Sequence, residues 1–561
     1  MAGTRDYGAS SVEGARLLPG GPDDVGLGGG PTALFVPLKG RVRRDNGWTA
    51  AWVVVYLATL AAGVGTFLNR NVNFATEINP DYLNDPSHCP ADAPSMRRGL
   101  LGMRSLQDEG GALSVDEFTS VSLYWLLGSV VGALLTGLLF VVLVTRMPRA
   151  VVGLAIGLQI GLPLVAGTSL MLGGTIGGGV PLLLLAGMTA LLFWLWREQL
   201  DLVCQLLGVS GHGLSENLGL IGAAIGIHAG LMLMSAPLLV SMISAVTNGH
   251  VAYNAARAPG GALPPPGGCV DSQGDQVTCC VWEVDSHVAP VITLASLTML
   301  WTSFIGGQVR TFTVSATVAQ WYFAPVADQL KPARSHSRVG DSLRGALGPA
   351  FGSLCFGALV LTVVDLMRSA LEELRKKAQE NVLLYCLFVL VQFLFTLVEM
   401  VTKFATVRIA ITGEAFWPAT RGVASLLQRT FLDTFGVWWF PPMILQMCAF
   451  VLSGAWAAGV FFAARATWSS LENGAVYAGL VAAVGFFLSW LVLSFFVCLL
   501  LDIVDAVYLC FAMDRDAGEV SRADVHAIYM QLPCAKNAVV VEQPGGEYAY
   551  AEAGPQQHQG R

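Results

Sequence analysis

Residues 475–501 read AVYAGLVAAVGFFLSWLVLSFFVCLLL and contain no charged side chain. An apolar stretch of about 20 residues is long enough to cross the hydrocarbon core of a bilayer as an α-helix. Comparable stretches recur from Trp48 onward. We place ten of them near residues 48–68, 119–145, 149–172, 175–196, 217–245, 287–312, 347–370, 381–403, 436–463 and 475–501. The sequence therefore predicts an all-α polytopic transmembrane helix bundle with about ten membrane-spanning helices.

The composition also indicates a membrane protein. Of the 561 residues, 54% are hydrophobic and only 13% are charged, and the mean hydropathy is +0.59. A water-soluble domain could hardly bury so much apolar surface. The formal net charge of -7 is spread over loops and tails without a dense basic block. We therefore expect the lipid bilayer, and not nucleic acid, as the surroundings of this chain.

Sequence motifs for catalysis and metal binding are absent. The chain lacks the phosphate-binding pattern GxxxxGK[ST], the hydrolase patterns GxSxG and HExxH, and any paired Cys/His ligand spacing. We expect neither an enzyme nor a bound metal or cofactor.

The distribution of basic residues predicts the orientation in the membrane. Residues 1–47 are rich in glycine and contain the cluster Arg41, Arg43 and Arg44. They are interpreted as a disordered tail on the cytosolic side, where basic residues accumulate. A transmembrane domain over residues 48–514 with an even number of helices returns the tail 515–561 to the cytosol. Both termini are thus expected to be cytosolic.

One basic group disagrees with this orientation. Arg375, Lys376 and Lys377 follow the seventh predicted helix and would lie outside the cell. The alternative to a wrong helix count is a long helix that projects into water. Its charge would then be offset by nearby acidic residues, namely Glu372, Glu373 and Glu380.

Cysteine positions provide a partly independent test, because disulfides form on the oxidising side of the membrane. The two long outer loops, residues 69–118 and 246–286, contain four cysteines: Cys89, Cys269, Cys279 and Cys280. We expect disulfides among these four. Their pairing cannot be read from the sequence.

Four stretches in the second half of the chain carry a family resemblance. They are FGSLCFGALVL at 351–361, TVAQWYF at 317–323, IAITGEAF at 409–416 and IVDAVYLCFAMD at 503–514. Their order and spacing resemble the choline transporter-like family, solute carrier family 44, and especially its fungal and protist members. The resemblance extends over roughly 290–530. It departs at residues 402–406, which read TKFAT where many relatives carry Asn-Arg and then Ala-Tyr, and this leaves the substrate open.

The resemblance implies a function. Members of this family move choline or a related amine such as ethanolamine across a membrane, driven by gradients, and we expect the same here, in the plasma membrane. The alternative is a channel-like or scaffold protein of the same fold that does not carry choline. The oligomeric state is left open.

Candidate binding residues follow from the chemistry of a quaternary ammonium group, which has no proton to donate. Aromatic faces and a nearby negative charge bind such a cation. We select the aromatic residues in or just beyond the sixth predicted helix, which are Trp301, Phe304, Trp321 and Tyr322. Ordinary packing or an interfacial aromatic belt is the alternative for these residues. Trp301 lies deepest and is the preferred wall of an aromatic cage.

Ionisable residues inside the predicted helices form a second group, because an unpaired charge in a bilayer is costly. Glu399 is the preferred charge-balancing or proton-coupling group, with Lys403 four residues later in a favourable order for an ion pair. The coupling or structural charges are Arg310, Asp365 and Asp505.

For two pairs of ionisable residues in the predicted helices, a structural role is the alternative to a role in transport. Asp365 and Arg368 are three residues apart on one helix and are expected to neutralise each other. Asp502 and Asp505 share a helix face near the predicted inner end. Solvation at that end, or a salt bridge to a basic loop residue, is as reasonable for them as transport chemistry.

Overall fold

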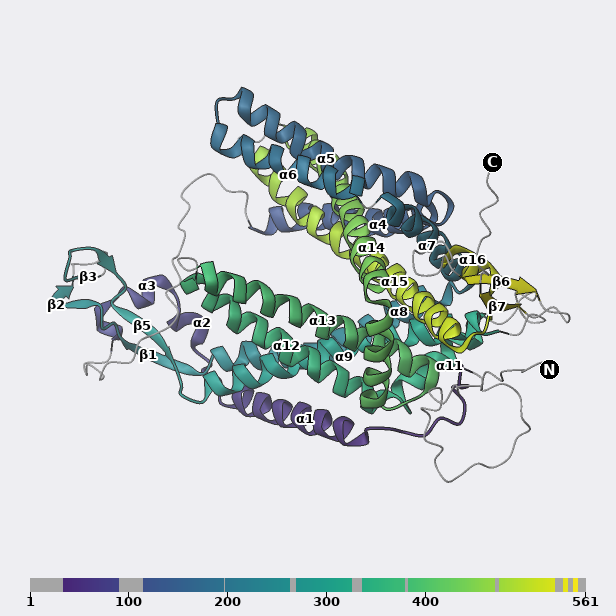
Figure 1. Ribbon diagram of the computed structural model, residues 1–561. Coiled ribbons are helices and arrows are strands. Elements are labelled where there is room, and N and C mark those ends of the chain that lie inside the picture. Colours follow the sequence, from purple (N-terminus) through teal and green to yellow (C-terminus); the bar gives the residue numbers. More distant parts are fainter. Residues whose placement is uncertain are drawn as a thin grey trace, which may run out of the picture. The chain divides into compact units, whose positions relative to one another are not determined.

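The computed structural model describes residues 34–89, 115–195, 197–262, 269–324, 335–378, 382–469, 474–529, 538–542 and 548–552. Figure 1 shows that most of these residues are helical. Within them, ten helices are long and apolar enough to cross a membrane, which confirms the ten predicted spans. These helices are α1 (Asn46–Leu68), α4 (Val115–Arg146), α5 (Pro148–Leu172), α6 (Ile176–Leu195), α8 (Gly219–Val246), α9 (Val288–Tyr322), α12 (Phe351–Ala378), α13 (Val382–Thr412), α14 (Phe416–Thr467) and α15 (Gly474–Ala517).

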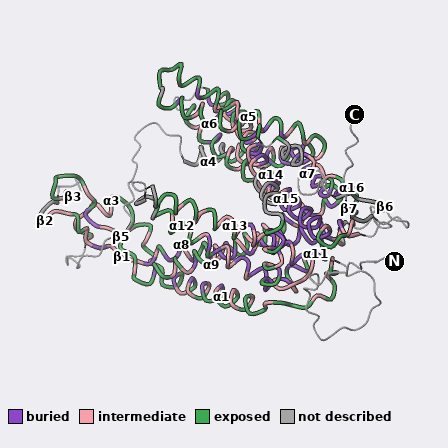
Figure 2. The backbone as a smooth tube through the Cα atoms, in the orientation of Figure 1, coloured by how far each residue is buried: buried purple, intermediate pink, exposed green. Residues whose placement is uncertain are grey.

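Helix α9 forms much of the protein interior. It packs against α1, α8, α12, α13 and α15, and its residues 311–319 are all buried (Figure 2). Many of these side chains are small, and Thr313 and Thr317 donate their hydroxyl protons to carbonyls one turn earlier, at 2.7 and 2.8 Å. Small residues allow close approach of helices in a membrane, and such back-bonds satisfy the hydroxyl group. α9 is therefore the helix on which α13 and α15 are positioned.

Two further helices lie between membrane-spanning ones. α7 (Arg197–Glu216) and α11 (Ser335–Leu347) are amphipathic and pack on α15 and α9, respectively. The residues around His212, which lie between the fourth and fifth predicted spans, form a helix and not a loop. Leu206, Leu207, Ser210 and Leu214 recur at helical spacing and are buried, so burial of one face stabilises α7.

A small disulfide-linked lobe is formed by the segment between α8 and α9 together with the segment after α1. Strand β1 (Gly249–Tyr253) pairs antiparallel with β5 (Cys280–Val284), with Gly249 opposite Val284 and Tyr253 opposite Cys280. A three-stranded sheet contains β2 (Arg257–Ala262), β3 (Cys269–Asp271) and β4 (Gln276–Val277). The lobe also contains three short helices, namely α2 (Phe74–Glu77), α3 (Pro80–Leu83) and the 3-10 helix η1 (Pro86–His88).

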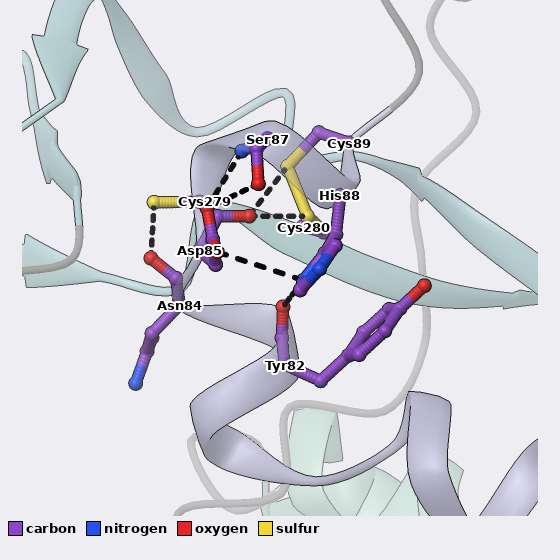
Figure 3. Close-up of polar contacts among 8 residues, drawn as sticks. All are labelled: Tyr82, Asn84, Asp85, Ser87, His88, Cys89, Cys279 and Cys280. Carbon is purple, nitrogen blue, oxygen red and sulfur yellow. Dashed lines mark hydrogen bonds and ion pairs between the residues drawn. A yellow bond between two sulfur atoms is a disulfide. The ribbon is translucent and has the colours of Figure 1, made fainter.

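The four cysteines that were expected in the outer loops form two disulfides, as predicted, and the structure supplies the pairing. Cys89 bonds Cys280 and Cys269 bonds Cys279. Figure 3 shows the turn that presents Cys89 to Cys280. In this turn the Asp85 carboxylate accepts hydrogen bonds from the Ser87 backbone N–H at 2.8 Å and from the Ser87 hydroxyl at 2.7 Å. These bonds lower the pKa of Asp85 and stabilise the turn in its charged form.

Residues 35–45 pack against the ends of membrane helices, so the expectation of a disordered tail over residues 1–47 is wrong for its last part. Residues 1–33 lie outside the described ranges. The Arg41 guanidinium donates to the carbonyls of Ile409, Ala410 and Ile411 at 3.0–3.1 Å. The last carbonyls of a helix lack intrahelical partners and carry partial negative charge. Arg41 therefore caps α13.

The charge of Arg41 persists at neutral pH, although burial lowers the pKa of its guanidinium to about 10. Asp45 extends the contact to two more helices. Its Oδ2 accepts from the Ser353 hydroxyl of α12 at 2.6 Å and from the Phe416 N–H of α14 at 3.0 Å. The segment thus joins three helix ends.

The other predicted tail is also structured in part. α16 (Ala523–Tyr529) contacts α7 and α15, and β6 (Ala538–Glu542) pairs with β7 (Tyr548–Glu552). The expectation of a tail from residue 515 onward is therefore corrected for 519–529, which contain the buried His526.

We predict that Arg41→Ala lowers the free energy of unfolding by about 2 kcal/mol, because three helix-end carbonyls lose a charged donor. Thermal unfolding of the purified protein in detergent measures the effect. Arg43→Ala is the matched control, since the Arg43 side chain is exposed. It should change stability by less than about 0.5 kcal/mol. Equal effects of the two substitutions would contradict the capping role.

Candidate functional site

Four charged side chains from three membrane helices meet in the protein interior. The Arg310 Nε of α9 donates to Asp502 Oδ2 of α15 at 3.0 Å. The Lys403 Nζ of α13 lies 3.2 Å from Asp502 Oδ1 and 2.5 Å from Asp505 Oδ2. We call Arg310, Lys403, Asp502 and Asp505 the ionic network. Its two cations and two anions balance.

Burial determines the energetics of the ionic network. The side chains of Asp502 and Asp505 are only 1% and 5% exposed, so the alternative in which water solvates them is wrong. Their partners come from helices and not from loops. Removing one member of a buried ion pair typically costs about 3–5 kcal/mol, because the other charge stays uncompensated. The ionic network therefore constrains the packing of α9, α13 and α15.

Glu399 forms a separate ion pair. Its Oε1 lies 2.8 Å from Nη2 of Arg368 on α12, and the Arg368 Nε also donates to the Gln392 side chain at 3.2 Å. Arg368 is thus paired across helices, rather than with Asp365 as expected. Similarly, Lys403 bonds α15 and not Glu399. The Glu399 side chain is 32% exposed, so this pair is less enclosed than the ionic network.

A neutral polar contact lies next to the ionic network in sequence. The Thr406 hydroxyl donates to the Gln308 side-chain oxygen, and both residues are buried. Gln308 precedes Arg310 by two residues and Thr406 follows Lys403 by three. The segment 402–406, where the sequence departs from the family pattern, therefore lies at the interface of α13 with α9 and α15.

Trp301 and Phe304 lie in a hydrophobic cluster. The Trp301 indole N–H donates to the Cys355 carbonyl of α12 at 3.1 Å, and Trp301 packs with Ile305, Leu354 and Phe416 in that cluster. Phe304 lies at its margin. These contacts are those of a packed core, and among the described residues no hydrogen bond, ion pair or ring contact joins Trp301 or Phe304 to Glu399.

Trp321 and Tyr322 lie at the other end of α9, where the C-terminal segment folds back. Arg522 covers the Trp321 ring with its guanidinium carbon 3.8 Å from the ring centroid. The Trp321 N–H donates to Glu216 of α7. An internal cation therefore covers one face of this ring, and cation–π attraction holds it there.

The Tyr322 hydroxyl belongs to a buried polar cluster. It donates to Asp514 Oδ2 at 3.2 Å and lies 2.9 Å from His526 Nε2. The Asp514 carboxylate also contacts His526 at 2.8 Å and accepts from the Ser521 N–H at 2.7 Å and hydroxyl at 2.9 Å. We call Tyr322, Asp514, Ser521 and His526 the C-terminal clamp. It fastens residues 519–529 to α9 and α15.

An aromatic stripe on α1 was missed by the sequence analysis. Trp48, Trp52 and Tyr56 recur every four residues. The Trp52 N–H donates to the Thr302 hydroxyl of α9 at 3.2 Å, and the Trp48 ring stacks on Phe356 of α12 at 4.6 Å between centroids. The i, i+4 spacing places such residues on one helix face, and this signal could have identified the stripe.

Comparison with known proteins identifies a family. Residues 180–516 match the family described as plasma-membrane choline transporter. Human choline transporter-like protein 2 is 35% identical over 133 residues, which cover 22% of this chain and 18% of that protein. Protein PNS1 of Saccharomyces cerevisiae is 22% identical over 268 residues, 46% of this chain and 45% of the yeast protein.

A CTL-like protein of Dictyostelium discoideum is 22% identical over 134 residues, 24% of each chain. The aligned segments therefore span less than half of each of these relatives.

We predict that Asp514→Asn weakens the C-terminal clamp, because a neutral amide is a poorer acceptor for four neighbouring groups. Residues 519–529 should then exchange their amide hydrogens at least about tenfold faster, as expected for a local loss of about 1.4 kcal/mol. Hydrogen exchange with mass spectrometry measures this.

Asp516→Asn is the control for this experiment. Asp516 pairs with Arg429 where both side chains are more than half exposed, and exposed pairs contribute little. Unchanged exchange in Asp514→Asn would contradict the clamp.

Proposed function

This chain belongs to the plasma-membrane choline transporter family, and we propose that it carries choline or a related amine such as ethanolamine across the plasma membrane, driven by gradients. Family membership supports a membrane transporter. The observation that carries the proposal furthest is the ionic network, which lies inside the matched region 180–516. Ionisable groups retained inside a membrane typically mark the pathway of a substrate or ion.

The chemistry of the ionic network supports a cationic substrate. Two carboxylates lie together at the interface of α9, α13 and α15 and already hold cationic groups. An amine substrate needs such a negative charge within the membrane. Glu399, which pairs with Arg368 of α12, lies on the same helix as Lys403, one turn away. We therefore place the coupling groups along α13, with Glu399 and Lys403 one turn apart.

The proposed orientation places both termini in the cytosol and the disulfide lobe outside. Oxidation of the lobe cysteines supports this side for the lobe. The C-terminal end of α13 contacts Val36 and Arg41, just before α1 begins. α1 runs from there to the lobe, where the Asn71 N–H bonds the Thr247 carbonyl. The opposite end of α13, with Phe388 beside Arg375 of α12, therefore faces outward together with the lobe.

The basic triplet is compatible with this orientation. α12 extends through Arg375 to Ala378, beyond the apolar span that ends at Glu373. Arg375 is exposed, whereas Glu380 lies outside the described ranges. The helix thus continues past its membrane-spanning part.

We predict that an epitope tag inserted between α12 and α13 is accessible to antibody on intact cells, because the proposed orientation places the connection between these helices outside. A tag at the N-terminus should be stained only after permeabilisation. Immunofluorescence of the full-length chain tests both positions. Staining of the inserted tag only in permeabilised cells would overturn the orientation.

Uptake of radiolabelled choline into proteoliposomes containing only this protein tests the function. We predict saturable uptake that ethanolamine competes. Glu399→Gln should reduce it about tenfold, equivalent to about 1.4 kcal/mol, because Arg368 loses its counter-ion and a coupling carboxylate is neutralised.

Glu372→Gln is the matched control, because Glu372 is exposed on α12, and it should transport normally. Unchanged uptake and pH dependence in Glu399→Gln would remove Glu399 from the mechanism. No amine uptake by the wild type under varied pH and voltage would favour the channel-like or scaffold alternative.

A further inference from the structure

Lys403 occupies a distinctive place in the ionic network. Its ammonium nitrogen lies between two carboxylates, 3.2 Å from Asp502 Oδ1 and 2.5 Å from Asp505 Oδ2. The Lys403 side chain is 29% exposed, whereas those of Asp502 and Asp505 are 1% and 5% exposed. Lys403 is therefore the most exposed member of the ionic network.

The two carboxylates depend on Lys403 unequally. Asp502 has a second cationic partner in Arg310, and the Thr311 hydroxyl donates to it at 3.4 Å. In the part of the chain that the structure describes, Lys403 is the one ion-pair partner of Asp505. Departure of Lys403 would thus leave one carboxylate, Asp505, without a counter-ion and in need of another cation.

The two cations also differ in exposure and in side-chain geometry. The Arg310 side chain is only 17% exposed, and a guanidinium holds carboxylates through a rigid planar fork. A lysine ammonium is a compact charge on a flexible four-carbon stem. Lys403 can therefore leave its position while Arg310 stays.

A second carboxylate is within reach of Lys403 on its own helix. Glu399 precedes Lys403 by four residues, and side chains with this spacing are neighbours on a helix surface, with a favourable order of charges. Glu399 now binds Arg368. Lys403 thus has its observed partners on α15 and an alternative partner, Glu399, one turn away on α13.

We propose that Lys403 is an internal counter-ion that holds the Asp502–Asp505 pair when no substrate is bound, and that the ammonium group of the transported amine displaces it toward Glu399. This inference rests on the proposed function. The exchange replaces one cation by another at Asp505, so the buried carboxylates are never left unpaired. It also explains why a partly exposed lysine and a partly exposed glutamate lie one turn apart.

The test measures choline binding through thermal stabilisation of the purified full-length protein, with sodium chloride replaced by choline chloride at constant ionic strength. Lys403→Gln removes the internal competitor, and the half-saturating choline concentration should fall at least about tenfold. Lys403→Arg retains the charge and adds a fork that can grip both carboxylates, and this concentration should rise at least about tenfold. A lysine that only stabilises the fold would not move the two variants in opposite directions.

Two further variants act as controls. Lys39→Gln removes a lysine whose side chain is 84% exposed and should bind choline as the wild type does. In Lys403→Gln/Asp505→Asn the charges balance again, and the gain in choline affinity should disappear. If Lys403→Gln does not fold, the loss of affinity in Lys403→Arg still tests the proposal.

Weaker choline binding in folded Lys403→Gln, or unchanged binding in Lys403→Arg, would overturn the inference. The same measurement with methylammonium chloride distinguishes failure of this inference from failure of the proposed function. If choline stabilises none of the proteins but methylammonium stabilises Lys403→Gln and not the wild type, Lys403 is still an internal counter-ion. The choline assignment alone then fails.

Discussion

The pairing of Asp502 with Arg310 and Lys403 is the constraint on which the arrangement of the membrane helices depends. A carboxylate with a side chain only 1% exposed cannot remain charged in the interior without partners. Its two partners come from α9 and α13, so the three helices cannot slide or rotate independently without breaking an ion pair. The close packing of α9, with its small hydroxyl residues, brings the charges within bonding distance.

The ends of these helices are held by two short segments that lie outside the spans. Before α1, Arg41 and Asp45 bind the terminal groups of α13, α12 and α14. Beyond α15, the C-terminal clamp holds residues 519–529 against α9. Both use charged or hydrogen-bonding groups to satisfy polar atoms that a helix end or a membrane interior leaves unpaired. An exchange of cations within the ionic network would thus take place between helices whose ends are fixed.

The sequence predicts where the helices lie along the chain far better than it predicts which side chains pair between helices. Length and hydropathy are local properties, so the ten spans could be placed. The loops between the spans then identified the four cysteines that form disulfides. The helical recurrence of Leu206, Ser210 and Leu214 would also have predicted α7. Ion pairing across helices depends on tertiary packing. Spacing alone therefore paired Lys403 with Glu399, whereas packing pairs Lys403 with Asp505 and Glu399 with Arg368. For the same reason, nothing in the residue types showed that Arg522 covers Trp321.

The central claim is that the contact between Lys403 and Asp505 gives way to a bound amine. A double-mutant cycle of Lys403→Gln and Asp505→Asn, measured by unfolding with and without saturating choline, tests it most directly. Without choline the cycle should give a coupling energy within the range of about 0.5–3 kcal/mol that contacting residues show. With choline bound, the coupling energy should fall toward zero, because the ammonium group of the ligand has taken the place of the lysine. An equal coupling energy in both conditions would contradict the account.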